Sequence, residues 1–143
     1  MIVASILNSK GRDVFSVAAE TPVRDAARYL QEKHVGAALV LNDAGGPAGV
    51  FSERDLLRTV AEHGGVGLAK PVGDLMSRDV AVCAPTDPIA HVMATMTERR
   101  CRHLPVVDAG KVVGVVSIGD VVKSRIAEAE MEAESLKAYI ASG

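Results

Sequence analysis

Large aromatic side chains are scarce in this chain of 143 residues, which has no tryptophan, two phenylalanines and two tyrosines. Its core must therefore be built mainly from Val, Leu, Ile and Ala, and a hydrophobic content of 48% supplies them. The two cysteines, Cys83 and Cys101, are too few for a disulfide framework. With no CxxC or HxxxH spacing we expect no metal site, and buried inert thiols are the simpler interpretation.

Neither sign of charge dominates, since 16 basic and 18 acidic residues leave a formal net charge of −2. A nucleic-acid groove would need a clustered basic surface, which this composition does not favour. No apolar run has the length of a membrane span, and the N-terminus lacks the pattern of a signal peptide. We therefore expect a cytoplasmic protein that binds neither nucleic acid nor a membrane.

What the chain does contain is an internal repeat. The segment 49–55 (GVFSERD) returns as segment 114–120 (GVVSIGD), at an offset of 65 residues. Further upstream the offset is 66, and the pairs are Val14 with Val80, Ala18 with Ala84, Pro22 with Pro88 and Val40 with Val106. The one-residue difference falls in a Gly-rich turn, where a hairpin tolerates a change of length. The repeat predicts two copies of one supersecondary unit, each burying the other's apolar face.

Hydrophobic periodicity predicts the same order of elements, β-α-β-β-α, in both copies. The first copy has a helical turn at 3–7, a strand at 14–17, a helix at 22–34 capped by Thr21, strands at 37–41 and 48–51, and a helix after Ser52 whose inner face is Leu56, Leu57, Val60 and Ala61. The second copy has a helical turn at 72–76, a strand at 80–82, a helix at 88–99, strands at 104–107 and 112–116, and a helix from Ser117. We expect an α+β fold with domains at 3–65 and 72–124 and a C-terminal helical extension at 125–143.

The last helix can continue from Asp120 to the end of the chain because no helix breaker precedes Gly143. Apolar residues alternate spacings of four and three along it, at Val122, Ile126, Ala129, Ala133, Leu136 and Ile140. Such a helix could fold back onto its own domain. A narrow heptad-like seam on a long tail instead favours a helix that faces a partner in a dimer.

Each copy places a serine where a buried strand ends and a helix begins, with an aspartate three residues later. The serine hydroxyl and the free N–H groups of a first helical turn form a natural anion site. A carboxylate accepts hydrogen bonds only, and it could hold the two hydroxyls of a ribose. The alternative is a capping box that needs no ligand. One copy alone favours the capping box, whereas two copies at one register favour a ligand site.

These residues resemble a known family, the tandem cystathionine-β-synthase-type (CBS) domains that form a Bateman module. The resemblance covers residues 3 to about 124 and is carried by segments 51–55 (FSERD), 102–106 (RHLPV) and 114–120. It implies two domains related by a pseudo-twofold axis, with clefts between their sheets for adenosine-containing ligands. Those ligands include AMP, ADP, ATP, S-adenosylmethionine and, in some stand-alone bacterial proteins, NAD(H).

The resemblance also implies roles for individual residues. Asp55 and Asp120 would hold the ribose, and Ser52 and Ser117 would meet the phosphate. The backbone beside the adenine would be Val14, Phe15, Val80 and Ala81. Arg102 and His103 correspond to Gly36 and Ala37 in the first copy, so they are candidate phosphate ligands, while Gly36 would leave space for the ligand. Arg54, whose counterpart is Gly119, is a further phosphate candidate.

We expect a non-catalytic module with no required cofactor, because no nucleophile motif or metal spacing is present. Its ligand would be an adenine nucleotide (AMP, ADP, ATP or NAD(H)), and an unidentified protein effector would read the change in its surface. We also expect a homodimer, because pairing would bury apolar helix faces such as those of Leu56, Leu57 and Val60. The alternative is a constitutive dimeric scaffold whose clefts hold no physiological ligand.

Overall fold

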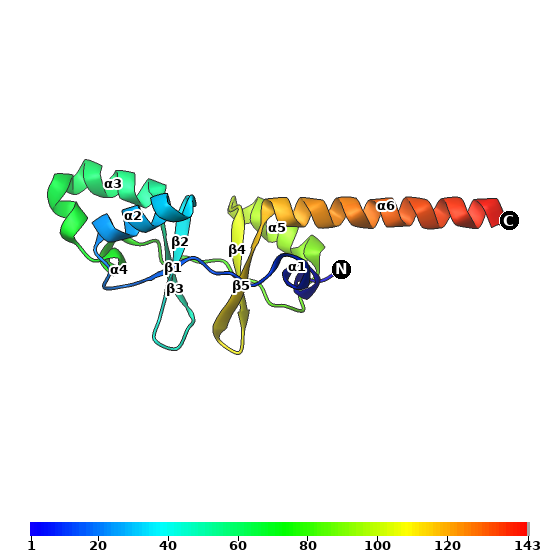
Figure 1. Cartoon of the computed structure of the whole chain (residues 1–143), viewed down its shortest axis with the longest axis horizontal. Helices are drawn as coiled ribbons and strands as arrows, with labels where there is room; N and C mark the ends of the chain where they lie inside the picture. The colour runs from blue at the N-terminus through cyan, green and yellow to red at the C-terminus, as the bar shows by residue number, and fades with distance from the viewer. Residues whose placement is uncertain (143) are drawn as a thin grey trace. The chain divides into compact units, whose positions relative to one another are not determined.

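The structure is a computed structural model, and it describes residues 1–142 (Figure 1). The helices are α1 (Val3–Lys10), α2 (Val23–Lys33), α3 (Glu53–His63), α4 (Val72–Leu75), α5 (Ile89–Arg99) and α6 (Ile118–Ser142), with a 3₁₀ helix η1 (Gly64–Ala69). The strands are β1 (Ser16–Ala18), β2 (Ala37–Leu41), β3 (Pro47–Ser52), β4 (His103–Asp108) and β5 (Lys111–Ser117). The predicted α+β class, with strands and helices in each repeat and a long C-terminal helix, is confirmed.

The chain forms two compact units. The first-repeat unit holds residues 13–80 and 109–112, and the second-repeat unit holds residues 1–12, 81–108 and the chain from Val113 onward. In the first-repeat unit β2 lies between β1, to which it is parallel, and β3, to which it is antiparallel. In the second repeat β4 pairs with β5, and the two strands are joined by a tight turn at Ala109 and Gly110. Both turn residues have positive φ, as a two-residue hairpin turn requires.

The strand predicted at 80–82 does not form, and only an isolated bridge between Cys83 and Val106 takes its place. In the first repeat Leu39 donates its N–H to the carbonyl of Phe15 at 2.9 Å. The residue equivalent to Leu39 in the second repeat is Pro105, which has no N–H to donate. The pairing therefore starts only at Cys83, whose N–H donates to the carbonyl of Pro105 at 3.0 Å.

Each repeat begins with a short helix, and this helix packs in the hydrophobic core of the other repeat. In the second-repeat unit α1 contributes Val3, Ile6 and Leu7 to the core. In the first-repeat unit α4 contributes Val72. The boundaries at 3–65 and 72–124 remain predictions for the sequence, because the compact units combine segments from both ranges.

The glycine that begins each repeated motif, Gly49 or Gly114, lies under a segment that packs on the strand. For Gly114 this segment is α1, and for Gly49 it is the chain directly after α4. A Cβ at Gly114 would lie 2.8 Å from a Leu7 methyl, and one at Gly49 would lie 2.5 Å from the Met76 sulfur. At Gly49 the backbone oxygen of Ser77 would also lie 2.8 Å from this Cβ, whereas at Gly114 the short distances are all to the Leu7 side chain. Close backbone approach therefore requires glycine at position 49, and glycine at position 114 lets the buried Leu7 side chain lie directly on the strand.

Two local predictions are wrong. The N-cap of α2 is Pro22 and not Thr21, and no side chain caps this helix. In α3 the predicted inner face is right for Leu56, which is partly buried against the core, and wrong for Leu57 and Val60, which are exposed (Leu57 to 71%). The buried positions of this helix are Asp55 and Thr59. The helix turns its Asp55 side toward the sheet because the carboxylate is held by hydrogen bonds there, and this rotates Leu57 outward.

Helix α6 leaves the second-repeat unit as one continuous helix. It packs on α5 and α1 through its first two turns, where Val121 and Ser124 are buried. From residue 129 to 142 every residue is exposed, and Figure 1 shows the helix continuing past α1 and α5. The alternative of a helix folded back on its own domain is therefore wrong. In residues 1–142, no helix combines the length and the apolar character needed to cross a membrane.

The position of α1 predicts where a core substitution acts. Leu7 is 1% exposed, and Leu7→Ala should lower the stability of the second-repeat unit by about 2–5 kcal/mol because it leaves a cavity. Native-state hydrogen exchange should show lost protection in β4, β5 and α5, although Leu7 belongs to the first repeat in sequence. Leu30→Ala, in the core of the first-repeat unit, is the matched control and should act first on β2 and β3. Loss of protection in β2 and β3 on Leu7→Ala would contradict this assignment.

Candidate functional site

In both units the start of a helix is tied to the residue that precedes a buried strand. The N–H of Glu53, first in α3, donates to the carbonyl of Gly36 at 2.9 Å. The N–H of Ile118, first in α6, donates to the carbonyl of Arg102 at 2.8 Å. One of the free amides of a first helical turn is thereby satisfied. This bond brings Arg102 and His103 next to the motif serine and aspartate of their own repeat.

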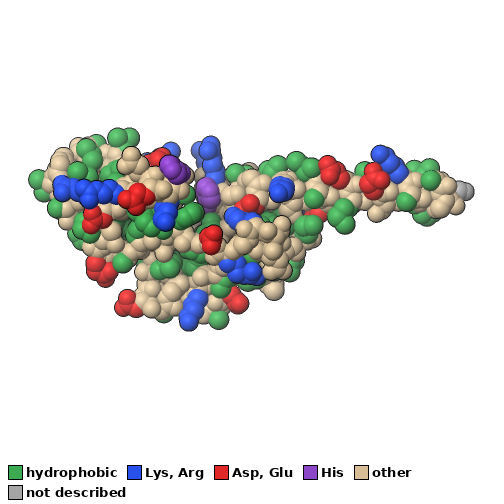
Figure 2. Space-filling model, viewed as in Figure 1, with side chains coloured by type: hydrophobic (Ala, Val, Ile, Leu, Met, Phe, Trp, Pro, Cys, Tyr) green, Lys and Arg blue, Asp and Glu red, His purple; other side chains and the backbone are tan. Residues whose placement is uncertain are grey.

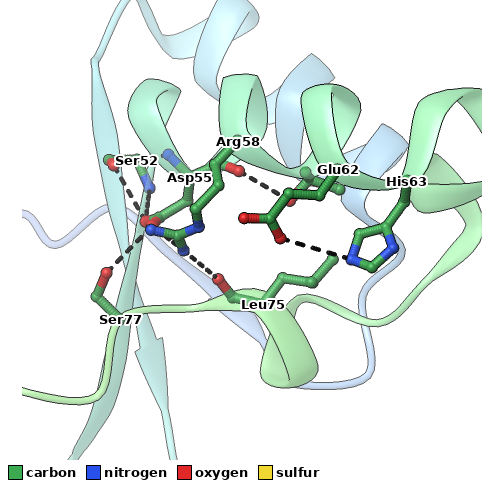
Figure 3. Close-up of polar contacts among 8 residues, drawn as sticks. Ser52, Asp55, Arg58, Glu62, His63, Leu75 and Ser77 are labelled. Carbon is green, nitrogen blue, oxygen red and sulfur yellow. Dashed lines mark hydrogen bonds and ion pairs between the residues drawn. The ribbon is translucent and has the colours of Figure 1, made fainter.

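In the first-repeat unit Ser52 and Asp55 form a complete capping box (Figure 3). Asp55 donates its N–H to the Ser52 hydroxyl oxygen at 3.3 Å. In return the Ser52 N–H and hydroxyl donate to Asp55 Oδ2 at 2.9 and 3.0 Å. The box fixes the first turn of α3 directly on the end of β3.

The other oxygen of Asp55 is also engaged. Arg58 and the Ser77 hydroxyl donate to Asp55 Oδ1 at 2.8 and 3.1 Å, as Figure 3 shows. Arg58 also donates to the carbonyl of Leu75 at 3.2 Å. A carboxylate has about four acceptor positions, and these four donors fill them. The Asp55 side chain is only 4% exposed, so a ribose would have to displace one of its donors.

The rest of this helix start is acidic. The Glu53 carboxylate lies over Gly36, with an oxygen 3.6 Å from the position of a Cβ on that glycine. The space that Gly36 was predicted to leave for a ligand is therefore partly filled by a negative group. Arg54 is exposed in the first turn of α3.

The second-repeat unit has the same motif contacts but a different partner for its aspartate. The N–H of Ser117 donates to Asp120 Oδ2 at 2.9 Å, and the N–H of Asp120 donates to the Ser117 hydroxyl at 3.1 Å. Lys10, the last residue of α1, donates to Asp120 Oδ2 at 2.7 Å and to the carbonyl of Val115 at 3.1 Å. The Asp120 side chain is 22% exposed, so this carboxylate is open to solvent where Asp55 is not.

Charge around Asp120 alters two pKa values. Partial burial acts to raise the pKa of Asp120, but hydrogen bonds from Lys10 and Ser117 outweigh it and lower this pKa. Desolvation and the Lys10 ammonium lower the pKa of His103, with a smaller effect of Arg102, while Asp120 opposes them. Lys10 therefore contacts Asp120 directly, and Lys10, Arg102 and Asp120 are close enough to His103 to act on its charge, so these residues form a cluster in which His103 resists taking up a positive charge.

Lys10 is the residue of this cluster that sequence reasoning missed. It lies 110 residues before Asp120, in a helix assigned to the first repeat. In the sequence, a lysine just before Gly11 indicates only that a helix ends at this point. Only the packing of α1 in the second-repeat unit brings its side chain to Asp120.

The predicted adenine neighbours lie next to the first paired residues of each repeat. Val14 and Phe15 precede β1, and Phe15 is partly exposed. Val80 and Ala81 are half-buried and precede the bridge at Cys83. Burial, with a smaller effect of Asp87, raises the pKa of the Cys83 thiol to about 12. In the part of the chain that the structure describes, no three His, Cys, Asp or Glu side chains lie close enough to hold a metal ion.

The family model for the CBS domain matches this chain twice, at residues 3–62 and 72–127. This chain belongs to the CBS domain family. The two matches correspond to the two repeats, and the resemblance seen in the sequence is confirmed.

Other CBS proteins resemble this CBS pair over most of its length. It is 31% identical to the mitochondrial CBS domain-containing protein CBSX3 of Arabidopsis thaliana, over 99% of this chain and 72% of that protein. A putative signal-transduction protein with CBS domains from Burkholderia ambifaria is 42% identical, with a TM-score of 0.77 over 89% of this chain and 95% of that one. A CBS domain protein from Pyrobaculum aerophilum, solved in complex with AMP, is 30% identical, with a TM-score of 0.71 over 84% and 89% of the two chains.

The different environments of the two aspartates predict different costs of removing them from the CBS pair. Asp55→Ala should lower the free energy of unfolding by about 2–4 kcal/mol, because it removes a helix cap and leaves buried donors unpaired. Asp120→Ala should cost about 1 kcal/mol, since Lys10 is then free to be solvated. Chemical denaturation of both variants measures the difference. Equal losses would show that Asp55 is no more engaged than Asp120.

The lowered pKa of His103 predicts a pH dependence. Its ordinary value is 6.5, and the folded value is lower, so protonation favours the unfolded chain. The stability that neutral His103 contributes is fully present above pH 6.5 and is lost as the pH falls toward the folded pKa. Wild type should therefore lose more thermal stability than His103→Gln between pH 7.5 and 5.5. Asp120 titrates below its ordinary 3.8 and does not enter this range. Parallel curves for the two proteins would contradict the assignment.

Proposed function

We propose that this CBS pair is a non-catalytic regulatory module that binds an adenosine-containing ligand, such as AMP, ADP, ATP or NAD(H), at the motif residues of its repeats. The observation that carries the proposal is the basic cluster of Lys10, Arg102 and His103 at the start of α6, beside the half-open carboxylate of Asp120. Cationic groups beside a helix N-terminus suit a phosphate. A carboxylate next to them suits the hydroxyls of a ribose.

The ion pair of Lys10 with Asp120 links phosphate binding to ribose binding. In our proposal the ribose hydroxyls donate to Asp120 and take the place of the Lys10 ammonium. The freed ammonium then pairs with the phosphate, alongside Arg102. A ligand without phosphate would leave Lys10 without a partner, so the site should prefer phosphorylated ligands to adenosine.

The first repeat should bind the same ligands more weakly. Ser52 and Asp55 are the corresponding residues, but Asp55 is fully engaged by its four donors. Glu53 places a negative charge where a phosphate would lie, and Arg54 is the cation that could offset it. We therefore propose that the second repeat, with Ser117 and Asp120, is filled first.

Support for the ligand class comes from a relative. The CBS domain protein of Pyrobaculum aerophilum was solved with AMP, and it is 30% identical to this chain. The adenine would lie against the backbone of residues 14–15 or 80–81.

The signal would leave through helix α6, because Ser117 directly precedes this helix, Asp120 lies in its first turn, and the same helix extends out of the unit. Ligand shifts a conformational equilibrium only when it binds the two states differently. Exchange of the Lys10 ion pair provides such a difference, since it links α1 to α6. We propose a cytoplasmic homodimer whose protein effector reads this change. A constitutive dimeric scaffold is the alternative, and the duplicated serine–aspartate motif argues against it.

Calorimetric titration tests the proposal. Arg102→Ala should weaken AMP about tenfold by loss of a charge-assisted phosphate contact, while adenosine changes little. Asp120→Ala should weaken AMP and adenosine alike, because both carry the ribose. Arg28→Ala, which removes an exposed cation from α2, is the matched control and should bind as wild type does.

Three results would count against this assignment. Equal losses of AMP and adenosine on Arg102→Ala would show that this arginine does not contact phosphate. No heat with any adenine nucleotide would favour the scaffold. Nucleotide hydrolysis that disappears with Asp120→Ala would contradict the non-catalytic role.

A further inference from the structure

Helix α6 has two faces with different surroundings. The face with Val121 and Ser124 is buried in the second-repeat unit. A different face carries exposed apolar side chains: Ile126 is 54% exposed, Leu136 is 60% exposed and Ile140 is 68% exposed. Figure 2 shows apolar side chains between charged ones along the extended helix. Large exposed apolar side chains that recur along one helix face mark an interaction surface.

We call this face the α6 seam; it consists of Val122, Ile126, Ala129, Ala133, Leu136 and Ile140. Its spacings of four and three are those of the a and d positions of a coiled coil. In that register Val122, Ala129 and Leu136 are d positions, and the other three are a positions. Near the unit the seam continues into a shallow hollow lined by Ile118, Gly119 and Val122.

The charged residues beside the seam specify a partner. The register places Arg125 and Glu132 at g positions, and Lys123, Glu130 and Lys137 at e positions. In a parallel pair each g residue faces the e residue five positions later in the other helix. Arg125 then faces Glu130, and Glu132 faces Lys137. Both contacts join opposite charges, and twofold symmetry makes each of them twice.

An antiparallel pair of the same helices would be repulsive. With the a and d layers aligned about position 131, e residues face e residues and g residues face g residues. Glu130 would then face Glu130, Glu132 would face Glu132, and Lys123 would approach Lys137. The same apolar seam is buried in both orientations, so the charges decide between them.

We propose that the α6 seam binds the α6 seam of a second copy of this chain in a parallel two-stranded coiled coil. The alanines at 129 and 133 let the helices approach closely in the middle, and Ile126, Leu136 and Ile140 supply the apolar layers on either side. The seam spans about 27 Å, at 1.5 Å per residue. This pairing does not depend on the proposed ligand site.

Disulfide trapping measures the orientation. In a Cys101→Ser background, Cys83 stays unreactive because it is buried with a raised pKa. Leu136→Cys in the full chain should then form a disulfide-linked dimer under mild oxidation, because equivalent d residues face each other in a parallel pair. Ser135→Cys, one residue away and off the seam, should not. In an antiparallel pair two copies of residue 136 would lie about 15 Å apart, and only a mixture with Ile126→Cys would crosslink.

Sedimentation equilibrium tests the charges. Glu132→Lys should weaken dimerisation about tenfold, because two attractive contacts become repulsive. Adding Lys137→Glu should restore it, since the charges are exchanged. Glu134→Lys is the control: it removes the same charge and loses the intrahelical pair with Lys137 at 3.8 Å, but it lies off the seam.

Each outcome decides the proposal. A Leu136→Cys homodimer, together with the loss and rescue of affinity at 132 and 137, supports the parallel pair. Crosslinking only in the 126–136 mixture, a monomer at micromolar concentration, or equal effects of Glu132→Lys and Glu134→Lys overturns it. Circular dichroism of every variant should show unchanged helix content, because these residues are exposed.

Discussion

The junction between a buried strand and the following helix organises each half of this protein. The serine hydroxyl accepts the N–H of an aspartate three residues later, and the aspartate carboxylate accepts the N–H of the serine. The first residue of the helix donates its N–H to the carbonyl of the residue just before the neighbouring strand, Gly36 or Arg102. Side chains from two strands and one helix are thereby held within one small region. The candidate binding residues lie together because this junction must be satisfied for the unit to fold.

The two junctions have the same backbone hydrogen bonds, but their aspartates have different partners. In the first repeat, Arg58 and Ser77 donate hydrogen bonds to the second oxygen of Asp55, and the aspartate side chain is buried. In the second repeat Asp120 forms an ion pair with Lys10, at the end of another helix, and within the described residues this is its only ion pair. An ion pair at a partly exposed carboxylate is easily exchanged, whereas four hydrogen bonds to a buried one are not. Duplication therefore produced one junction suited to structure and one suited to exchange.

Much of the fold could be predicted from local patterns. The apolar run at 37–41 and the turn at Ala109 and Gly110 need only neighbouring residues to specify them, and the strands and hairpin formed as expected. The strand at 80–82 was wrong because its pairing depends on Pro105, more than twenty residues away. The inner face of α3 was wrong for a related reason. Hydrophobic periodicity places Leu57 inward, but the hydrogen bonds of Asp55 rotate the helix.

The sequence by itself determined the duplication, the family and the motif serines and aspartates, because these are properties of residue order and short spacing. The alignment of the two copies paired Arg102 and His103 with Gly36 and Ala37, and the family resemblance made them candidate phosphate ligands. Only the tertiary structure decided which cation meets which aspartate. Lys10 reaches Asp120 because α1 packs in the second-repeat unit, where Leu7 lies against Gly114. Such a contact depends on which helix fills which core, and no pattern within either repeat records that choice.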